Sequence, residues 1–210
     1  MFLSRPSEPT TVLLWGDRWW WPGRGASGEF TDGPGAVAAL VSHLAEAPKP
    51  VRLRLLFQPD ALATVATLCP NGDRRTLVQA LGPEHPALTQ PGQTWSHEPI
   101  LAAGDGFATY LHYETEPYLL PLAVALARAG LVLDSAWPLA AWLQALPDEW
   151  SASGAFTVLA VSGSRALAYS HPAAGARTIR QWQGAAVAAE VAGWIQEIIR
   201  SDPTHEVLIL

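Results

Sequence analysis

The sequence has little of what small secreted proteins and membrane-spanning proteins are built from. Cys69 is the only cysteine among the 210 residues, so an internal disulfide framework is excluded. No window of about 18 consecutive apolar residues occurs, and we therefore expect no membrane-spanning helix. The first residues lack an apolar run behind a basic start, so we do not expect a signal peptide there.

Charge is also scarce, and its balance is acidic. Charged residues make up 15% of the chain, against about 25% in typical globular proteins. The net charge of −6 argues against a nucleic-acid partner, because such a protein needs a basic face. Hydrophobic residues make up 49%, enough for a sizeable core in one or two compact units. We expect protein partners to cover part of the surface.

The sequence does contain short apolar runs in a definite order, most clearly in its last quarter. Runs at residues 156–161, 165–170 and 177–182 are separated by short polar breaks and predict three strands. Residues 185–200 have the apolar period of a helix, and residues 206–210 form one more apolar run. The order is βββαβ.

The first part of the chain has the same predicted order. Apolar or aromatic runs predict strands at residues 11–15, 19–21 and 29–31. Helical spacing of apolar residues between Gly33 and Pro48 predicts a helix, and the alternation at residues 51–57 predicts another strand. The architecture is repeated although the sequence is not.

Residues 58–104 interrupt this order, and we interpret them as a small subdomain inserted in the first lobe. Six prolines break any long element there. A strand at residues 62–68 and a short helix at residues 73–81 are predicted within it.

After the insertion we predict a strand at residues 107–113 and a helix at residues 118–129, which ends before Gly130. A strand at residues 131–134 and a bridging helix at residues 137–146 follow. The predicted domains are therefore residues 1–147 and 148–210.

Three segments carry a family resemblance. They are Leu68-Cys69-Pro70 with the helix that follows it, the run from Tyr118 to Leu131, and Trp137-Pro138-Leu139-Ala140. With them the chain resembles the cytoplasmic domain of the L component of type II secretion systems and the related M protein of type IV pilus assembly.

The resemblance implies an α/β, actin-like (ribonuclease H-like) fold with duplicated βββαβ lobes, the second of them truncated. It implies a structural scaffold on the cytoplasmic side of the bacterial inner membrane, held there through a segment not present in this chain. The implied partners are the secretion or pilus ATPase and inner-membrane assembly proteins. Whether the chain forms a homodimer stays open.

Actin-like ATPases need an Asp-x-Gly turn after the first strand of each lobe, where backbone N–H groups meet phosphate and the carboxylate handles metal-bound water. The first turn has Gly16 and Asp17 in the wrong order, and the second has Gly163 and Ser164 without an Asp. We therefore expect no enzyme activity and no cofactor. The alternative is an actin-like ATPase that uses Asp17 as the metal-side carboxylate and Gly163 and Ser164 for phosphate.

Other polar residues are given structural roles. His112, Glu114 and Glu116 alternate along a predicted strand, but ligands spaced along one extended face do not converge on a metal ion. We predict an exposed polar face there and no metal site. Cys69 is predicted to be a small buried residue, since no basic neighbour in the sequence activates it.

The ten tryptophans are the other unusual feature. Successive residues of a strand face opposite ways, so Trp20 and the pair Trp19 and Trp21 cannot all enter one core. One set is predicted to be core, and the other, together with Trp194, is a candidate contact for partners. A second alternative function follows, a ligand-binding module for sugars or proline-rich peptides.

Overall fold

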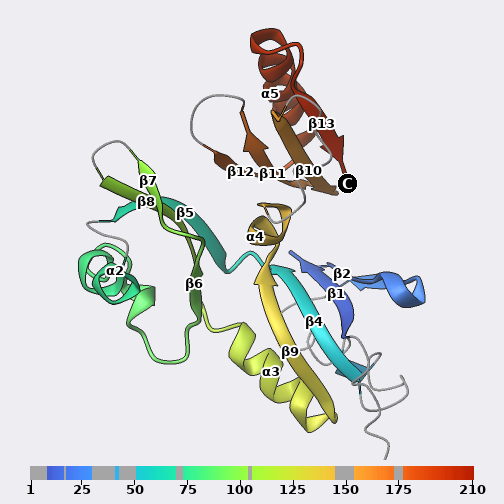
Figure 1. Cartoon of the computed structure of the whole chain (residues 1–210). Coiled ribbons are helices and arrows are strands. Elements are labelled where there is room, and N and C mark those ends of the chain that lie inside the picture. The colour runs from blue at the N-terminus through green and yellow to red at the C-terminus, as the bar shows by residue number, and fades with distance from the viewer. Residues whose placement is uncertain are drawn as a thin grey trace, which may run out of the picture. The chain divides into compact units, whose positions relative to one another are not determined.

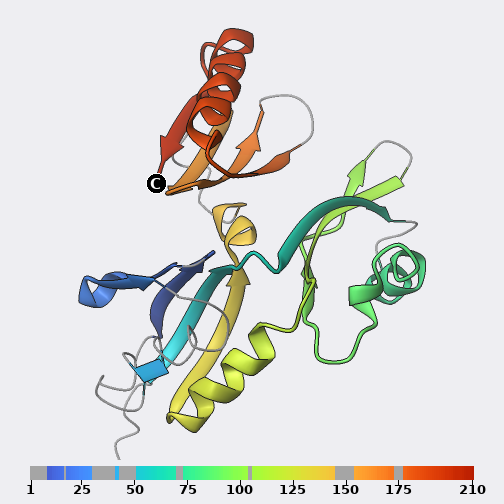
Figure 2. The ribbon, with the colours of Figure 1, turned by 180° about the vertical axis from the view of Figure 1, so that it is seen from behind.

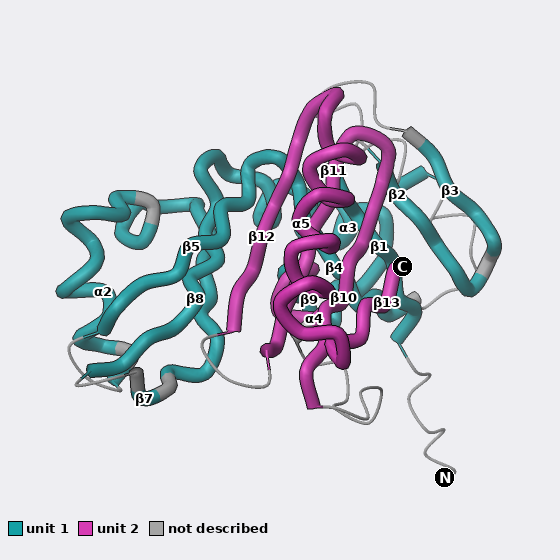
Figure 3. The backbone as a smooth tube through the Cα atoms, turned by 90° about the horizontal axis from the view of Figure 1, so that it is seen from above, with its two compact units in different colours: residues 1–138 teal, residues 139–210 magenta. Residues whose placement is uncertain are grey.

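The structure is a computed structural model that describes residues 9–16, 18–29, 41–42, 51–69, 73–103, 106–144, 154–172 and 177–210. The chain divides into two compact units, residues 1–138 (unit 1) and residues 139–210 (unit 2), which Figure 3 colours separately. The predicted boundary between residues 147 and 148 lies outside the described residues and stays a prediction. The predicted helix between Gly33 and Pro48 also lies mostly outside them, although Val41 and Ser42 are helical.

Unit 1 contains a five-stranded sheet, sheet A, with the strand order β3-β2-β1-β4-β9 (Figure 1). The first three strands form antiparallel hairpins, whereas β4 is parallel to both β1 and β9. The strands are β1 (Thr10–Trp15), β2 (Arg18–Trp21), β3 (Ala26–Glu29), β4 (Val51–Gln58) and β9 (Leu131–Pro138).

The third strand lies earlier than residues 29–31, where we predicted it. After β2 a single 3-10 turn, η1 (Pro22–Arg24), is closed by Gly25 in the left-handed conformation (φ 60°), and β3 begins at once. Gly28 in β3 lies against the Trp19 indole, and a Cβ there would come within 2.6 Å of the indole nitrogen. The absence of a side chain at Gly28 thus leaves the space in which Trp19 packs.

Among the described residues, helix α3 (Leu119–Arg128) lies beside β9 of this sheet. Leu122 and Leu126 are fully buried in the core cluster of sheet A, as their spacing predicted. Gly130 follows the helix with a φ of 74°, which is the left-handed end that the sequence indicated.

A second sheet of unit 1, sheet B, has the order β5-β8-β6, with β7 also paired to β8. Figure 2 shows β5 and β8 side by side. Sheet B includes β8, so it continues past residue 104, where we predicted the insertion to end. Its elements are β5 (Leu62–Cys69), α2 (Arg74–Leu81), η2 (Pro86–Leu88), β6 (Trp95–His97), β7 (Leu101–Ala103) and β8 (Gly106–Glu114).

The predicted bridging helix at residues 137–146 begins later than expected. Trp137 and Pro138 belong to β9, where they pair with Leu56 and Phe57 of β4. A proline is tolerated there because β9 is an edge strand and needs no N–H on its outer side. Helix α4 (Leu139–Gln144) follows and belongs to unit 2, and residues 145–146 lie outside the described part.

Unit 2 contains sheet C, with the order β12-β11-β10-β13. Helix α5 contacts β11 and β12, and α4 contacts β11. The four predicted strands and the predicted helix are confirmed to within two residues at each end. They are β10 (Phe156–Ser162), β11 (Arg165–His171), β12 (Thr178–Gln183), α5 (Val187–Ser201) and β13 (Glu206–Ile209).

The same winding therefore occurs twice. In each unit three antiparallel strands come first, and a later strand returns parallel to the first of them. The first hairpin of each unit turns through a left-handed glycine, Gly16 (φ 58°) and Gly163 (φ 57°). Of the helices in the described residues, none has the length and apolar character needed to cross a bilayer.

Candidate functional site

The residues predicted to contact phosphate lie at the first hairpin turn of each unit. Gly16 follows β1, and its backbone N–H donates to the carbonyl of Gln58 at 2.9 Å, so this donor is used within the sheet. Asp17 lies outside the described residues. Gly163 and Ser164 are exposed at the turn between β10 and β11, and their assignment to a nucleotide site stays a prediction.

The tryptophans of β2 divide as alternation requires. Trp19 and Trp21 are buried in the core of sheet A, with 5% and 4% of their surface exposed, and Trp20 is half-buried. In unit 2, Trp194 of α5 is half-buried, and its ring centroid lies 5.0 Å from that of Trp182. The guanidinium of Arg180 lies 5.7 Å from the Trp194 ring centre. Trp20 and Trp194 are the more accessible members of the predicted contact set.

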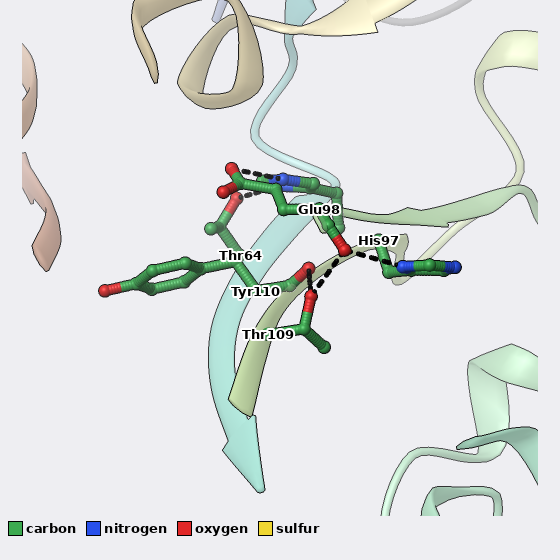
Figure 4. Close-up of polar contacts among 6 residues, drawn as sticks. Thr64, His97, Glu98, Thr109 and Tyr110 are labelled. Atoms are coloured by element: carbon green, nitrogen blue, oxygen red, sulfur yellow. Dashed lines mark hydrogen bonds and ion pairs between the residues drawn. The ribbon is translucent and has the colours of Figure 1, made fainter. Parts of the chain in front are cut away.

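Sheet B holds a polar cluster that the sequence did not predict (Figure 4). His112 of β8 is 1% exposed. Its Nε2 lies 3.1 Å from Oε1 of Glu98, and its Nδ1 lies 3.0 Å from the hydroxyl of Thr64 on β5. One imidazole therefore joins three segments of the sheet, through a carboxylate on one side and a hydroxyl on the other.

The backbone of Glu98 is held as firmly as its side chain. Its N–H donates to the carbonyl of Tyr110 at 3.0 Å. Its own carbonyl accepts from the hydroxyl of Thr109 at 2.8 Å and from Nδ1 of His97 at 2.7 Å. These contacts fix the chain where it leaves β6 (Figure 4).

Two residues along β8, Glu114 is also fully buried. One carboxylate oxygen accepts from the backbone N–H of Thr94 at 2.8 Å, and the other accepts from the N–H groups of Tyr118 and Leu119. A carboxylate at this place accepts hydrogen bonds from backbone N–H groups that have no partner within α3, and its negative charge interacts favourably with the dipole at the start of the helix. Burial, and then the charge of Glu114, raise the pKa of Tyr118 to about 12.

The prediction of an exposed polar face at His112, Glu114 and Glu116 is therefore wrong for the first two residues. Only Glu116 is exposed. The spacing of His112 and Glu114 was visible in the sequence, and so was the neighbouring pair His97-Glu98. The pairing of β6 with β8 was not, and this pairing brings Glu98 to His112.

A cavity of about 120 Å³ lies in unit 1 beside this cluster. His112 lines it, whereas Thr64 and Glu98 do not, and its lining is otherwise mainly apolar. Thr64, His112 and Glu98 contain the groups of a nucleophile, base and acid relay. Thr64 is half-buried and does not line this cavity, so the cavity gives a substrate no access to its hydroxyl. The arrangement therefore suits a role in holding the strands together.

Unit 2 has a smaller buried network of its own. The hydroxyl of Thr157 on β10 donates to that of Ser170 on β11 at 2.9 Å, and Nε2 of His205 lies 2.9 Å from the same Thr157 oxygen. The Thr157 hydroxyl therefore joins Ser170 on β11 to His205. Burial lowers the pKa of His205, against a smaller opposing effect of Asp202.

Cys69 is buried in the core of sheet B, as predicted, and burial raises the pKa of its thiol. Within the described part of the chain, no three His, Cys, Asp or Glu side chains converge as metal ligands would.

No protein-family model and no curated protein sequence matches this chain. Solved structures do match. The cytoplasmic domain of EpsL, an inner-membrane component of the type II secretion system of Vibrio cholerae, aligns with 97% of this chain and 83% of its own, at a TM-score of 0.54 and 15% identity. A structure of the PilM–PilN type IV pilus biogenesis complex aligns with 94% of this chain, at a TM-score of 0.56 and 14% identity.

This chain spans 66% of the matched chain in the PilM–PilN complex. A third match is a Bacteroides thetaiotaomicron protein of unknown function with an actin-like ATPase fold, at 7% identity, a TM-score of 0.50 and 96% coverage of this chain. The fold is thus α/β and actin-like, as the family resemblance implied. At these identities the likeness establishes the fold and not the activity.

Proposed function

We propose that this chain is an assembly component of a bacterial type II secretion or type IV pilus machine and acts by binding other proteins. The observation that carries the proposal is the likeness of fold to the EpsL cytoplasmic domain and to a PilM–PilN complex, over nearly the whole of this chain. The proposed location is the cytoplasmic face of the inner membrane. The proposed partners are the secretion or pilus ATPase and inner-membrane assembly proteins.

A scaffold without ATPase activity is the second part of the proposal. The N–H of Gly16, which an active turn would offer to phosphate, donates instead to the carbonyl of Gln58. The turn at Gly163 carries serines on both sides and no carboxylate. An actin-like site needs a carboxylate for its metal ion, so the second turn lacks a group that the reaction requires.

An interaction experiment tests the first part. The gene is deleted in its native host and complemented with a tagged copy, and the tagged protein is purified after crosslinking in cells. We expect loss of pili or of protein secretion on deletion, and a secretion or pilus ATPase or an inner-membrane assembly protein among the crosslinked products. Normal pili and secretion in the deletion strain would refute the proposal.

Calorimetry with ATP and Mg²⁺ tests the second part. The full chain is titrated beside the Asp17→Ala variant. We expect no saturable binding to either protein. Stoichiometric binding that Asp17→Ala abolishes would instead favour the alternative of an active actin-like ATPase, which draws some support from the matching left-handed glycines of the two turns.

A further inference from the structure

Among the described residues, no strand of unit 2 pairs with the outer edge of β13, and we propose that this edge pairs antiparallel with β13 of a second copy of this chain. β13 is the last strand in the order β12-β11-β10-β13 (Figure 1). The inference is independent of the proposed function, because it uses only the edge of this sheet.

The hydrogen bonds between β13 and β10 show which backbone groups are already used. The N–H of Glu206 donates to the carbonyl of Ala155 at 3.1 Å, and the N–H of Leu210 donates to the carbonyl of Leu159 at 2.8 Å. Peptide groups alternate in direction along a strand. Residues 206, 208 and 210 therefore direct their backbone groups at β10.

It follows that Val207 and Ile209 direct their N–H and C=O groups away from the sheet. The side chain of Ile209 is 62% exposed, and the neighbouring Leu208 and Leu210 are 38% and 49% exposed. An edge strand with free backbone groups and apolar side chains is a ready template for another strand.

This edge also lacks the residues that protect other edges of the molecule. Edge strands are commonly guarded by charged side chains or by proline. The opposite edge of sheet C, β12, carries Arg180, and the edge strand β9 of sheet A carries Asp134 and Pro138. Within β13 the only charge is Glu206, at its start.

Unit 1 indicates that a strand fits at this position of the winding. There β4 corresponds to β13, since each is the strand that returns parallel to the first strand of its sheet. The outer edge of β4 is covered by β9 through seven residue pairs. A fifth strand beside β13 would cover the outer edge of sheet C at the corresponding place, although β9 is parallel to β4 and the proposed strand is antiparallel to β13.

A second copy of β13 suits the edge because the strand is complementary to itself. Pairing centred on Leu208 places Val207 of one copy opposite Ile209 of the other, twice over, so all the outward groups of both residues are used. The same register places Glu206 opposite Leu210, so the two carboxylates lie at opposite ends of the pair. A two-fold axis through Leu208 closes the interface at two copies.

The interface is short, and the dimer should therefore be weak and dependent on concentration. Both partners carry a net charge of −6, which opposes association at low ionic strength. Added salt screens that repulsion. We expect the dimer to be favoured by salt, unlike an association through ion pairs.

The experiment compares the parent chain with three variants by sedimentation velocity, over protein concentrations from micromolar to millimolar. Ile209→Pro removes an outward N–H and leaves the bonds to β10 intact, and the residue before a proline still favours extended backbone. We expect its dimer dissociation constant to rise at least about thirtyfold, since the symmetric pair loses two hydrogen bonds. Ile209→Ala keeps the backbone groups and should change the constant much less.

Ile199→Lys is the matched surface control, because Ile199 is 46% exposed on α5 and does not lie on the edge. Hydrogen exchange on the unmodified chain gives a second readout, since the amides of Val207 and Ile209 should become protected as concentration rises. The circular dichroism of Ile209→Pro must match that of the parent. A chain that stays monomeric at millimolar concentration, or a dimer that Ile209→Pro leaves intact, would overturn the proposal.

Discussion

The two units arrange four strands in the same order. They differ in whether the parallel strand is an edge strand and in which polar side chains are buried. In unit 1 the parallel strand β4 is enclosed between β1 and β9, and α3 covers the sheet next to β9. In unit 2 the parallel strand β13 is itself the edge. The same strand order can thus occur with the parallel strand inside the sheet, as in unit 1, or with the parallel strand at its edge, as in unit 2.

The buried polar groups differ as well. Unit 1 buries a pair of ionisable side chains, Glu98 and His112, together with the carboxylate of Glu114. Unit 2 buries the hydroxyls of Thr157 and Ser170 beside His205, whose pKa is lowered by burial. Unit 1 should therefore depend more on its two buried acidic side chains keeping their partners, and unit 2 on a network of hydroxyls and one imidazole.

The largest effect is expected from Glu98→Ala. The substitution leaves a nitrogen of the buried His112 imidazole without its carboxylate partner, and a buried polar group that loses its partner costs up to about 3 kcal/mol. Native-state hydrogen exchange should show this loss in the amides of β6 and β8 and little change in β10 and β11. Glu98→Gln is the matched control, because its amide oxygen still accepts from the imidazole and should retain part of the stability. Equal losses in the two variants would show that a neutral acceptor does not hold the imidazole, and would contradict this account.

The second prediction concerns alkaline pH and also separates the units. The pKa of Tyr118 is about 12 in the folded chain and about 10 when unfolded. Its stabilising contribution is complete below pH 10 and is lost as pH rises through 12, which lowers the free energy of unfolding by no more than about 3 kcal/mol. Urea unfolding across this range, followed by a probe in unit 1, measures the loss.

Tyr118→Phe removes the titrating group and keeps the ring, so the variant should lose part of the pH dependence above pH 10. Probes in unit 2 should be unaffected by the substitution. The same slope in parent and variant would mean that Tyr118 ionises as freely in the folded chain as in the unfolded chain.

The order of strands and helices in unit 2 could be predicted from the sequence, because it depends on local periodicity, whereas the short strands β6 and β7 of unit 1 were missed. The segments of unit 2 are the clearest case, since each apolar run there is bounded by its own turn residues. The start of β3 was misplaced because Ala26, Ser27 and Gly28 look like a loop unless one knows that Trp19 packs against Gly28. The helix expected at Trp137 was an extension of β9, which depends on pairing with a distant strand.

The candidate site shows the same limit more sharply. Nothing local to His112 indicates that it is buried, because its environment is created by Glu98 and Thr64 on two other segments. The alternation of His112 and Glu114 predicted one shared face correctly. Whether that face is buried or exposed depends on the pairing of β8 with β5 and β6. The sequence does not show this pairing, and the prediction of an exposed face was therefore wrong for His112 and Glu114.

A third, smaller effect is expected in unit 2. Thr157→Val keeps the shape of the side chain and removes the hydroxyl that joins Ser170 and His205. Leaving buried partners unsatisfied costs about 1–3 kcal/mol, which should appear as reduced protection of the amides of β10, β11 and β13. Thr178→Val on the exposed start of β12 serves as the control and should be nearly silent. A loss in unit 1 instead would show that the two units do not unfold separately.

The smallest effect tests whether the two hairpin turns are equivalent. Gly16 and Gly163 have nearly equal φ values in the left-handed region, where a side chain costs roughly 1–2 kcal/mol. A Cβ at Gly163 would meet nothing within 4 Å, so Gly163→Ala should report backbone strain alone. We expect Gly16→Ala to destabilise unit 1 by a similar amount, measured by unit-specific hydrogen exchange.

Gly193→Ala within α5 is a control of opposite sign. It should stabilise unit 2 by about 1 kcal/mol, since a Cβ there also meets nothing within 4 Å and alanine favours the helix. Unequal costs at Gly16 and Gly163 would mean that the shared winding does not extend to shared turn energetics.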